Sequence, residues 1–396
     1  MGGEVTLQLT DTQKEIVETV RDFVENEVIP VADEMEHRDE YPEKIVEQMK
    51  ELGLFGLTVP EEHGGIGESL LTYALTVVEL ARGWMSLSGV LNTHFMGCYL
   101  INKFGTEEQK TSFLPRMATG EIRAALAMSE PEAGSDVQAI RTKAIRDGDE
   151  YVMNGQKMWL TNGLRSGIVM TLAKTDPEAD PPHRGMSMFI VEKKPGEVKP
   201  APGLDCGKNI EKMGYKGIET IEMTFSDFRA PASSLLGQEE GQGFRQVLDG
   251  IEVGRVNVSA RAVGVSTRAF EEAIRYSQQR KAFGKPIKDH QAIQIHLAEM
   301  GTTLEAAKLM LYSAAEKKAS GERSDLEAGM AKLFASEACH EIVTKSLRVH
   351  GGYGYSKEFT VERLYRDAPF LLIGEGTSEI QKTVIARRLL EKYRIQ

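Results

Sequence analysis

Three short segments combine small residues with hydroxyl, carboxyl or aromatic side chains, as a ligand site requires. They are Met128–Asp136 (MSEPEAGSD), Met158–Asn162 (MWLTN) and Ile373–Glu379 (IGEGTSE). Glycine lets a backbone approach a ligand closely and frees its N–H to donate, while Ser and Thr hydroxyls hydrogen-bond carbonyls or phosphates. Each segment by itself also fits a plain structural interpretation, namely a capped turn, a core aromatic residue near a hairpin and a solvated loop acid.

The motifs of several common enzyme classes are missing from the sequence. There is no GxGxxG that opens a helix after a strand, no GxxxxGK[ST] and no GxSxG, and His340-Glu341 lacks the second histidine of HExxH. The eight histidines form no ligand cluster in the sequence. A Rossmann enzyme, a P-loop enzyme, a metal enzyme or a serine hydrolase is therefore not expected.

Composition and charge narrow the class further. The 396 residues carry 48 Lys and Arg against 59 Asp and Glu, a net charge of −11, which argues against non-specific binding to nucleic acid or to an anionic membrane. With 41% hydrophobic and 27% charged residues, the composition is that of an ordinary soluble globular protein of two or three domains.

Cysteine usage and the lack of targeting signals predict a cytoplasmic protein. Cys98, Cys206 and Cys339 have no CxxC spacing, so we expect buried, reduced thiols. Residues 1–10 lack the pattern of a secretory signal, and no uncharged apolar run approaches the roughly 18 residues that span a membrane. Residues 1–6 match the loose pattern for N-myristoylation, but no polybasic segment follows, so no lipid anchor is expected.

Helices are predicted to surround a β-rich middle third. Thr10 and Gln13 predict a capping box before an apolar helical stripe, and helical composition continues through 70–81 and 106–117. From 122 to 236 short β-type runs alternate with turn dipeptides. Asp147-Gly148 separates two such runs, and Asn154-Gly155 predicts a hairpin.

Helical periodicity returns after a Gly-rich break at 237–243 and predicts a bundle of long helices. Apolar residues then recur at close to heptad spacing, at Ile293, Leu297, Met300, Leu304 and Leu311. We therefore expect an α+β multidomain fold: an N-terminal α-helical domain (1–120), a middle antiparallel β domain (121–236) and a C-terminal α-helical bundle (237–396).

The order of these segments resembles that of the acyl-CoA dehydrogenase family over essentially the full length of the chain. Further matching segments are Arg280–Lys285 (RKAFGK), His350–Gly354 (HGGYG) and Arg366–Ala368 (RDA). The resemblance implies an FAD-dependent oxidoreductase that acts on an acyl-CoA substrate, as in fatty acid beta-oxidation, and passes electrons to an electron-transfer flavoprotein.

The resemblance also implies which residues hold FAD. Residues expected along the flavin are Leu126, Ala127, Met128, Ser129, Gly134 and Ser135, of which Ser135 also reaches the substrate. Trp159 and Thr161 would cover and hydrogen-bond the isoalloxazine, and Thr377 and Glu379 would contact the cofactor from their loop. A neighbouring subunit of a homodimer or homotetramer would supply the contacts to the pyrophosphate and adenosine, namely Arg280, Phe283, Gln291, Arg348, Gly351 and Gly352.

Glu375 is the catalytic base by the same resemblance. Oxidation of a saturated thioester needs a base for the α proton, a hydride acceptor for the β hydrogen and donors at the thioester oxygen. A closed pocket should raise the pKa of Glu375 above its ordinary value, while Gly374 and Gly376 let the loop bring the Glu375 N–H to the oxygen, with Gly376 beside the substrate. Relatives with the base on a helix carry it at the position of Gly254, which leaves Glu375 as the candidate.

The CoA portion and the acyl pocket are expected elsewhere along the chain. Glu252 and Arg255 match the family's acidic-x-x-Arg pair that touches CoA, although an i, i+3 surface ion pair is the plain alternative. The segment Val90–Cys98 is expected to line the end of the acyl chain, and its bulk favours a short or branched group. Because no Arg or Lys lies between Gly83 and Asn102, monocarboxylic acyl groups are favoured.

Three positions depart from the family pattern. Gly374 replaces a bulky tyrosine, so the pocket is expected to be wider or the loop looser. Arg348 replaces a glutamine, and its guanidinium either pairs with the diphosphate or lies on the helix surface. Glu379 replaces an amide. Two rival functions stay open at this point: an acyl-CoA oxidase that uses O2, and a non-catalytic relative that binds nucleic acid, against which the charge of −11 argues.

Overall fold

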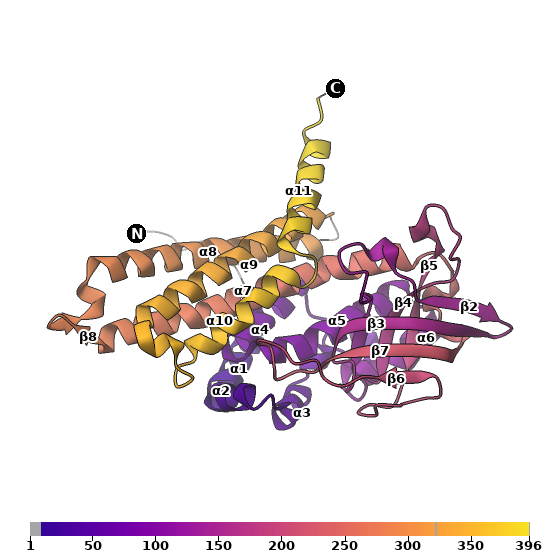
Figure 1. The fold of residues 1–396 in the computed structure, drawn as a ribbon, viewed down its shortest axis with the longest axis horizontal. Coiled ribbons are helices and arrows are strands. Elements are labelled where there is room, and N and C mark those ends of the chain that lie inside the picture. Colours follow the sequence, from indigo (N-terminus) through magenta and orange to yellow (C-terminus); the bar gives the residue numbers. More distant parts are fainter. Residues whose placement is uncertain (1–8, 321–322, 396) are drawn as a thin grey trace.

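The computed structural model describes residues 9–320 and 323–395. Helices come first, a β-sheet occupies the middle of the chain and long helices follow, so the predicted fold class is confirmed (Figure 1). The N-terminal residues 1–8, for which no leader and no lipid anchor are predicted, lie outside the described residues. The domain boundaries at 120/121 and 236/237 stay predictions.

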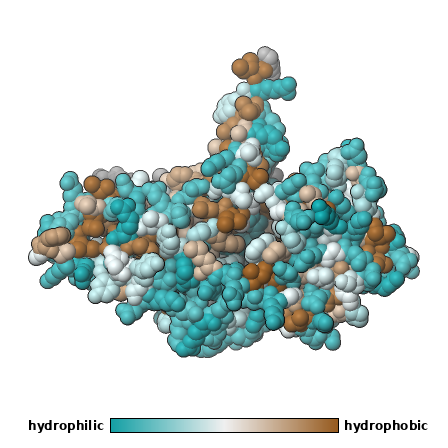
Figure 2. Space-filling view, in the orientation of Figure 1, coloured by the Kyte–Doolittle hydropathy of each residue, from teal (hydrophilic) through white to brown (hydrophobic). Residues whose placement is uncertain are grey.

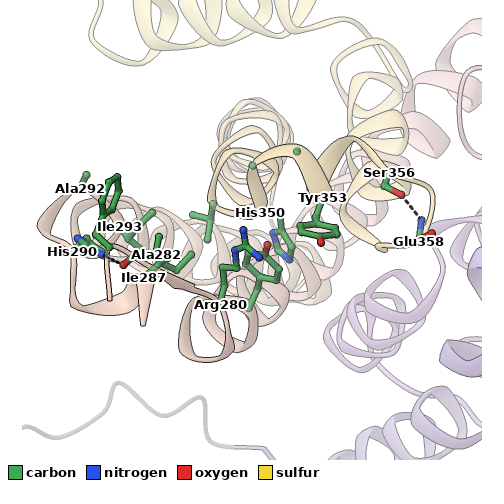
Figure 3. A pocket seen from close by; sticks show the side chains of 15 residues that line it. Arg280, Ala282, Ile287, His290, Ala292, Ile293, His350, Tyr353, Ser356 and Glu358 are labelled. Atoms are coloured by element: carbon green, nitrogen blue, oxygen red, sulfur yellow. Dashed lines mark hydrogen bonds between the residues drawn. The ribbon is translucent and has the colours of Figure 1, made fainter. Parts of the chain in front are cut away.

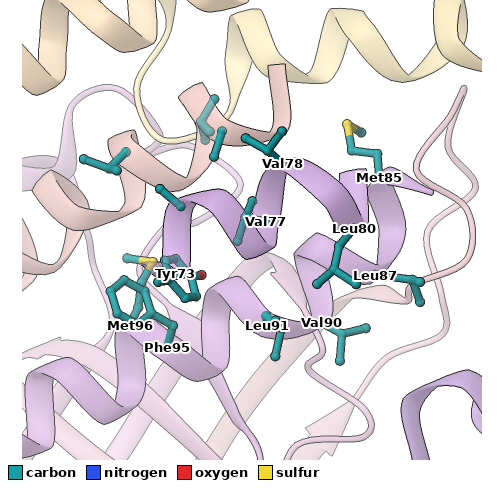
Figure 4. Packing of buried hydrophobic residues seen from close by; sticks show 14 of the residues in the cluster. Tyr73, Val77, Val78, Leu80, Met85, Leu87, Val90, Leu91, Phe95 and Met96 are labelled. Carbon is teal, nitrogen blue, oxygen red and sulfur yellow. The ribbon is translucent and has the colours of Figure 1, made fainter. Parts of the chain in front are cut away.

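From residue 9 onward, the N-terminal part contains six α-helices. Thr10 and Gln13 form the predicted capping box at its start, and a π-helical stretch, 24–28, separates the first two helices. The helices are α1 (Asp11–Phe23), α2 (Ile29–His37), α3 (Glu43–Glu51), α4 (Leu70–Gly83), α5 (Met85–Phe104) and α6 (Glu107–Ala118). Helices α4 and α5 are buried along almost their whole length, and Figure 4 shows their apolar side chains packed against each other.

The middle part is a seven-stranded sheet. Its strands are β1 (Ala124–Ala127), β2 (Lys143–Asp147), β3 (Glu150–Thr161), β4 (Ile168–Lys174), β5 (Met186–Glu192), β6 (Leu204–Cys206) and β7 (Thr220–Pro231). Their order is β1-β4-β2-β3-β7-β6, with β5 also on β4. Most pairs are antiparallel, as predicted, but β4 runs parallel to β1 and to β2.

One turn prediction is wrong. Asp147-Gly148 does lie at the β2–β3 hairpin, whereas Asn154-Gly155 lies inside the continuous strand β3, at a β-bulge opposite β7. Gly155 has φ of 148°, and a Cβ there would lie 2.4 Å from Oγ1 of Thr142. The glycine is therefore required by a close approach within the sheet, because turns and bulges share the same demand for unusual backbone angles.

The C-terminal part is a bundle around one very long helix. Its helices are α7 (Gly243–Gln279), α8 (Gln291–Ala319), α9 (Asp325–His350), α10 (Val361–Ile373) and α11 (Ser378–Lys392), and two short strands, β8 (Lys281–Ala282) and β9 (Lys285–Pro286), lie between α7 and α8. Helix α7 packs against α4, α5, α8 and α9, and α11 projects from the body of the molecule (Figure 1). None of the helices within 9–320 and 323–395 is long and apolar enough to cross a membrane.

A buried carboxylate joins the N-terminal helices to a loop of the β domain. Glu36 of α2 accepts hydrogen bonds from the Trp84 indole at 2.7 Å and from the backbone N–H of Lys216 at 3.1 Å. The next contact along this loop is the N–H of Tyr215, which donates to Oδ1 of Asp367 at 2.7 Å. The loop that carries Tyr215 is therefore held from both sides. The three cysteines are buried and free, as predicted.

Candidate active site

Glu375 lies in a four-residue loop between α10 and α11 whose backbone has an unusual path. Glu375 and Gly376 have φ of 56° and 89°, and a left-handed conformation is costly for a residue with a side chain. The surrounding structure stabilises the loop: the ammonium of Lys332 donates to the Gly376 carbonyl at 2.8 Å, and the Gln381 amide donates to the Glu375 carbonyl at 3.3 Å. Thr377 caps the N-terminus of α11.

The carboxylate of Glu375 occupies space that α7 leaves free. A Cβ built on Gly254 would lie 2.8 Å from Oε2 of Glu375 and 3.3 Å from the sulfur of Met96. The other oxygen, Oε1, accepts a hydrogen bond of 3.1 Å from the Asn92 amide of α5. The glutamate on the loop and the glycine on the helix are thus sterically linked.

The environment of Glu375 favours a protonated carboxyl group. Burial raises its pKa from the ordinary value near 4.5, against the opposing effects of Arg261, the Asn92 hydrogen bond, Arg255 and Lys332. Burial likewise lowers the pKa of Lys332 to about 8. A buried carboxylate with a raised pKa is suited to accept a proton from carbon.

The N–H of Glu375 is a backbone donor next to this carboxylate. Within residues 9–320 and 323–395, the N–H of Glu375 has no hydrogen-bond partner, as expected of a group that binds a ligand oxygen. Beside it, a Cβ on Gly374 would lie 2.8 Å from the ring of Phe370. The ring of Phe370 therefore fills the space next to Gly374. A wider pocket or a looser loop was expected at this glycine.

A bulge in β3 exposes Trp159. The pairing of β3 with β7 shifts between Lys157 and Leu160, and Trp159 has φ of 66° with 55% of its surface exposed. The preceding residue, Met158, donates its N–H to the carbonyl of Ser129 at 2.9 Å. This contact places the end of β1 and its following segment beside the exposed indole.

A buried ion pair, which the sequence did not reveal, fixes that segment. The ammonium of Lys157 lies 2.8 Å from Oε1 of Glu130 and donates to the Met128 carbonyl at 3.1 Å, while Glu130 also accepts from the N–H groups of Arg141 and Thr142. Burial lowers the pKa of Lys157 to about 8. The signal in the sequence was a lysine in a strand position that alternation assigns to the core.

The other residues predicted along the flavin differ in exposure. Leu126, Met128, Ser129 and Thr161 are partly buried, Ala127 is buried in the sheet core, and Gly134 and Ser135 are exposed. A Cβ on Gly134 would meet no atom within 4 Å, so its backbone is open to a ligand. An exposed indole beside hydroxyls and open backbone fits the isoalloxazine of FAD, a flat ring with polar edges.

Helix α5 connects the strand with Trp159 to the loop with Glu375. The Asn162 amide, just after β3, donates to the Gly89 and Val90 carbonyls at 3.2 Å and to Thr93 at 2.6 Å. Asn92, which contacts Glu375, is the adjacent residue. The end of β3, whose Trp159 is predicted to cover the flavin, and the predicted base Glu375 are therefore held by the same turn of α5. Exposed apolar surface gathers at the seam between the sheet and the C-terminal helices (Figure 2).

The residues predicted for the pyrophosphate and adenosine lie far from Glu375 in the same chain. Arg280, Phe283, Gly351 and Gly352 line a cavity of about 820 Å³ beyond the end of α7 (Figure 3), whereas Gln291 and Arg348 are exposed nearby and do not line it. Gly254 and Arg280 are 26 residues apart on one helix, roughly 39 Å at 1.5 Å per residue. One chain does not bring the two groups together.

Glu252 and Arg255, the residues predicted to contact CoA, do not pair with each other. Glu252 lies 3.1 Å from the Lys318 ammonium and accepts from the Ser324 hydroxyl at 2.7 Å, so the plain i, i+3 ion pair with Arg255 is not formed. Arg255 is largely buried, and burial lowers its pKa. Glu379 is exposed at the start of α11.

The segment Val90–Cys98 divides into two faces. Asn92 and Met96 face Glu375 and Gly254, and Phe95 stacks on Tyr73 with ring centres 4.0 Å apart (Figure 4). His94 lies on the other side, 3.1 Å from the Phe55 carbonyl, and burial lowers its pKa to about 4. His94, although part of the predicted lining segment, therefore does not face Glu375 as Asn92 does.

Comparison with known protein families matches the chain in three consecutive stretches. The N-terminal domain of acyl-CoA dehydrogenases matches residues 10–121, the middle domain matches 125–228 and the C-terminal domain matches 241–390.

Individual relatives match over almost the whole chain. A (2S)-methylsuccinyl-CoA dehydrogenase of Cereibacter sphaeroides is 40% identical over 98% of this chain and 72% of its own length. An acyl-CoA dehydrogenase of Bacillus subtilis is 39% identical over 97% of this chain and 99% of its own length.

Solved structures agree in fold. Butyryl-CoA dehydrogenase from Megasphaera elsdenii superposes with a TM-score of 0.93 at 35% identity, over 98% of this chain and 100% of that one. A chain from structural work on the electron transferring flavoprotein of Acidaminococcus fermentans gives the same values.

These matches cover all three parts of the fold, including strand β3 with Trp159 and the loop with Glu375. The chain belongs to the acyl-CoA dehydrogenase family, whose members are oxidoreductases with FAD as their cofactor.

Proposed function

We propose that this protein oxidises an acyl-CoA thioester to the trans-2-enoyl-CoA, with Glu375 as the base that removes the α proton. The position of the Glu375 carboxylate supports this proposal most directly, because it packs against Gly254 and accepts a hydrogen bond from Asn92. The helix carries glycine at position 254, so among the residues that the structure describes Glu375 is the candidate base.

The residues of the chain have separate tasks in this reaction. The Glu375 carboxylate takes the proton from C2, and its unpaired N–H binds the thioester oxygen, where negative charge develops. Bound FAD would supply the acceptor for the hydride that leaves C3. Asn92 orients the carboxylate, and the nearby charges of Arg261, Arg255 and Lys332 limit the rise in its pKa.

The FAD site is proposed to be shared between subunits of a homodimer or homotetramer. Within one chain, Gly254, beside Glu375, and Arg280 are roughly 39 Å apart along α7, which supports a contribution by a second copy. Phe283 is 95% exposed in the single chain, and the projecting α11 is followed by exposed Tyr393 and Ile395, surfaces that a second copy is suited to bury.

An electron-transfer flavoprotein is the proposed electron acceptor. The likeness to a chain studied with the electron transferring flavoprotein of Acidaminococcus fermentans supports this choice. The names of the relatives include both a monocarboxylic and a dicarboxylic thioester, so they do not decide the acyl group. The cytoplasm is the proposed location, since all three cysteines are free and buried.

Replacement of the base tests its role directly. Glu375→Gln keeps the shape of the side chain and its contact with Asn92 but cannot take a proton. We expect turnover with the preferred acyl-CoA to fall by at least about a hundredfold, while the protein retains bound flavin. The measurement is anaerobic loss of the yellow flavin band on mixing with acyl-CoA. Undiminished bleaching would exclude Glu375 as the base, and steady peroxide formation in air would favour the oxidase.

The raised pKa of Glu375 predicts two opposite trends with pH. Flavin reduction requires the ionised carboxylate, so its rate should rise with pH through a midpoint above 4.5. Stability should change the other way, because a carboxyl with a raised pKa in the folded state favours folding at low pH and loses this contribution as pH rises through the folded pKa.

The matched comparison is the thermal midpoint of the parent protein against Glu375→Gln, measured from about pH 5 to pH 8. We expect the glutamine variant to gain stability relative to the parent as pH increases. A difference that stays constant over this range would contradict a raised pKa.

A surface variant tests the shared cofactor site. Phe283→Ala removes an exposed ring that supports no core of its own chain, so the fold should be kept while FAD is lost more readily. The measurement is bound flavin per chain after gel filtration, together with the oligomeric state. Val198→Ala, another exposed apolar position at 49%, is the control. Equal flavin content in both variants would argue against a role for Phe283.

A further inference from the structure

Arg261 is a buried arginine without a carboxylate partner. Its side chain, on α7, is 1% exposed, and its Nη1 donates to the Tyr215 hydroxyl at 3.0 Å. Among the residues that the structure describes, its Nε has no partner and no acid lies within 4 Å. By contrast, the buried Arg268 and Arg363 each lie within 2.9 Å of a carboxylate. A buried cation without a counter-ion is costly, so a ligand anion is the natural partner.

The position of Arg261 relates it to the proposed base. Gly254 and Arg261 are seven residues apart and share one face of α7, about 10 Å apart along the axis. Side chains on a helix lean toward its N-terminus, so the guanidinium reaches back toward Gly254 and the Glu375 carboxylate. Arg261 is also the charge that most strongly opposes the raised pKa of Glu375.

Other buried polar atoms on α7 and α5 also lack partners among the described residues. Asn257 lies between Gly254 and Arg261 on the same helix face. Its amide donates to the Tyr73 hydroxyl at 2.8 Å, and its oxygen has no partner among the described residues, nor has that of Asn92. A pocket built for a purely aliphatic acyl group gains nothing from such groups, because unpaired buried polar atoms are destabilising.

Tyr215 lies between Arg261 of α7 and Gly89 of α5. A Cβ on Gly89 would lie 1.7 Å from the Tyr215 hydroxyl, so this glycine makes room for the group to which Arg261 donates. The guanidinium carbon lies 5.5 Å from the ring centre of Tyr215 and 5.8 Å from that of Phe370. The cation absent from the Gly83–Asn102 sequence is therefore supplied beside it by α7.

Resting on the proposed function, we propose that Arg261 binds a carboxylate at the far end of the acyl group, so that the substrate class is a short dicarboxylic acyl-CoA. The α proton and the β hydride leave as in the proposed reaction, and the distal carboxylate stays unchanged. The proposed dicarboxylic substrate replaces the earlier expectation of a monocarboxylic acyl group. That expectation rested only on the lack of Arg and Lys between Gly83 and Asn102. Arg261 is thus a specificity-determining residue.

Matched pairs of thioesters separate binding from chemistry. Valeryl-CoA and glutaryl-CoA have five-carbon acyl groups and differ in the terminal methyl or carboxylate, and butyryl-CoA and succinyl-CoA form the four-carbon pair. Their dissociation constants are measured by calorimetry on the flavin-loaded Glu375→Gln protein, which does not turn them over, with and without Arg261→Gln. Arg268→Gln, two turns further along α7, removes a buried guanidinium that has its own acid and is the control.

We expect tighter binding of the dicarboxylic member of at least one pair. Arg261→Gln should weaken that member about thirtyfold or more, the usual cost of removing one partner of a buried charge pair, and leave the monocarboxylic member within about threefold. Arg261→Lys should recover part of the preference, and the Arg268 control should keep it.

Several results would overturn the inference. One is a preference for the monocarboxylic members in the protein with Arg261 intact, which decides the matter even where Arg261→Gln does not fold. Another is an equal loss for both members, which would make Arg261 a positioning residue for Glu375. Anaerobic bleaching of the unaltered protein distinguishes the two levels: bleaching by butyryl-CoA or valeryl-CoA alone contradicts only this inference, and bleaching by no acyl-CoA contradicts the proposed function.

Discussion

The fit of one carboxylate against one helix backbone is the constraint on which the site depends. Glu375 reaches its position only because Gly254 has no side chain, and the loop that carries it adopts two consecutive left-handed residues. Lys332 and Gln381 hold that backbone by hydrogen bonds to its carbonyls. The same confinement that fixes the carboxylate also removes it from water and raises its pKa, so position and reactivity have a single physical cause.

Two helices give the site its geometry. Thr93 of helix α5 accepts a hydrogen bond from Asn162, which lies just after the strand with the exposed Trp159. The adjacent residue of α5, Asn92, donates to Glu375. The sheet and the loop are therefore aligned by a rigid, buried element. Helix α7 has the opposite effect, since its length separates Gly254 from Arg280 by roughly 39 Å. The frame thus places the Glu375 loop and the strand with Trp159 on one chain, and in our proposal a second copy supplies the outer cofactor contacts.

Sequence patterns predicted what depends on local order, and missed what depends on distant contacts. The capping box at Thr10 and the helical periodicities are local and are confirmed. Asn154-Gly155 was misassigned because a hairpin and a bulge both need glycine, and only the approach of Thr142 separates them. Asn92 lies 283 residues from Glu375 in sequence, and nothing near Arg261 in the chain indicates that it is buried without an acid. The roles of these residues become visible only when the elements are packed together.

The central claim is that the Glu375 carboxylate removes the proton at C2, and hydrogen exchange at that carbon measures this step alone. An acyl-CoA analogue with oxygen at position 3 has no hydride to give, so incubation with the flavin-loaded protein in D2O isolates the proton transfer. We predict that the unaltered protein incorporates deuterium at C2, whereas Glu375→Gln binds the analogue without exchange. Equal exchange by both proteins would contradict a role of Glu375 as the base.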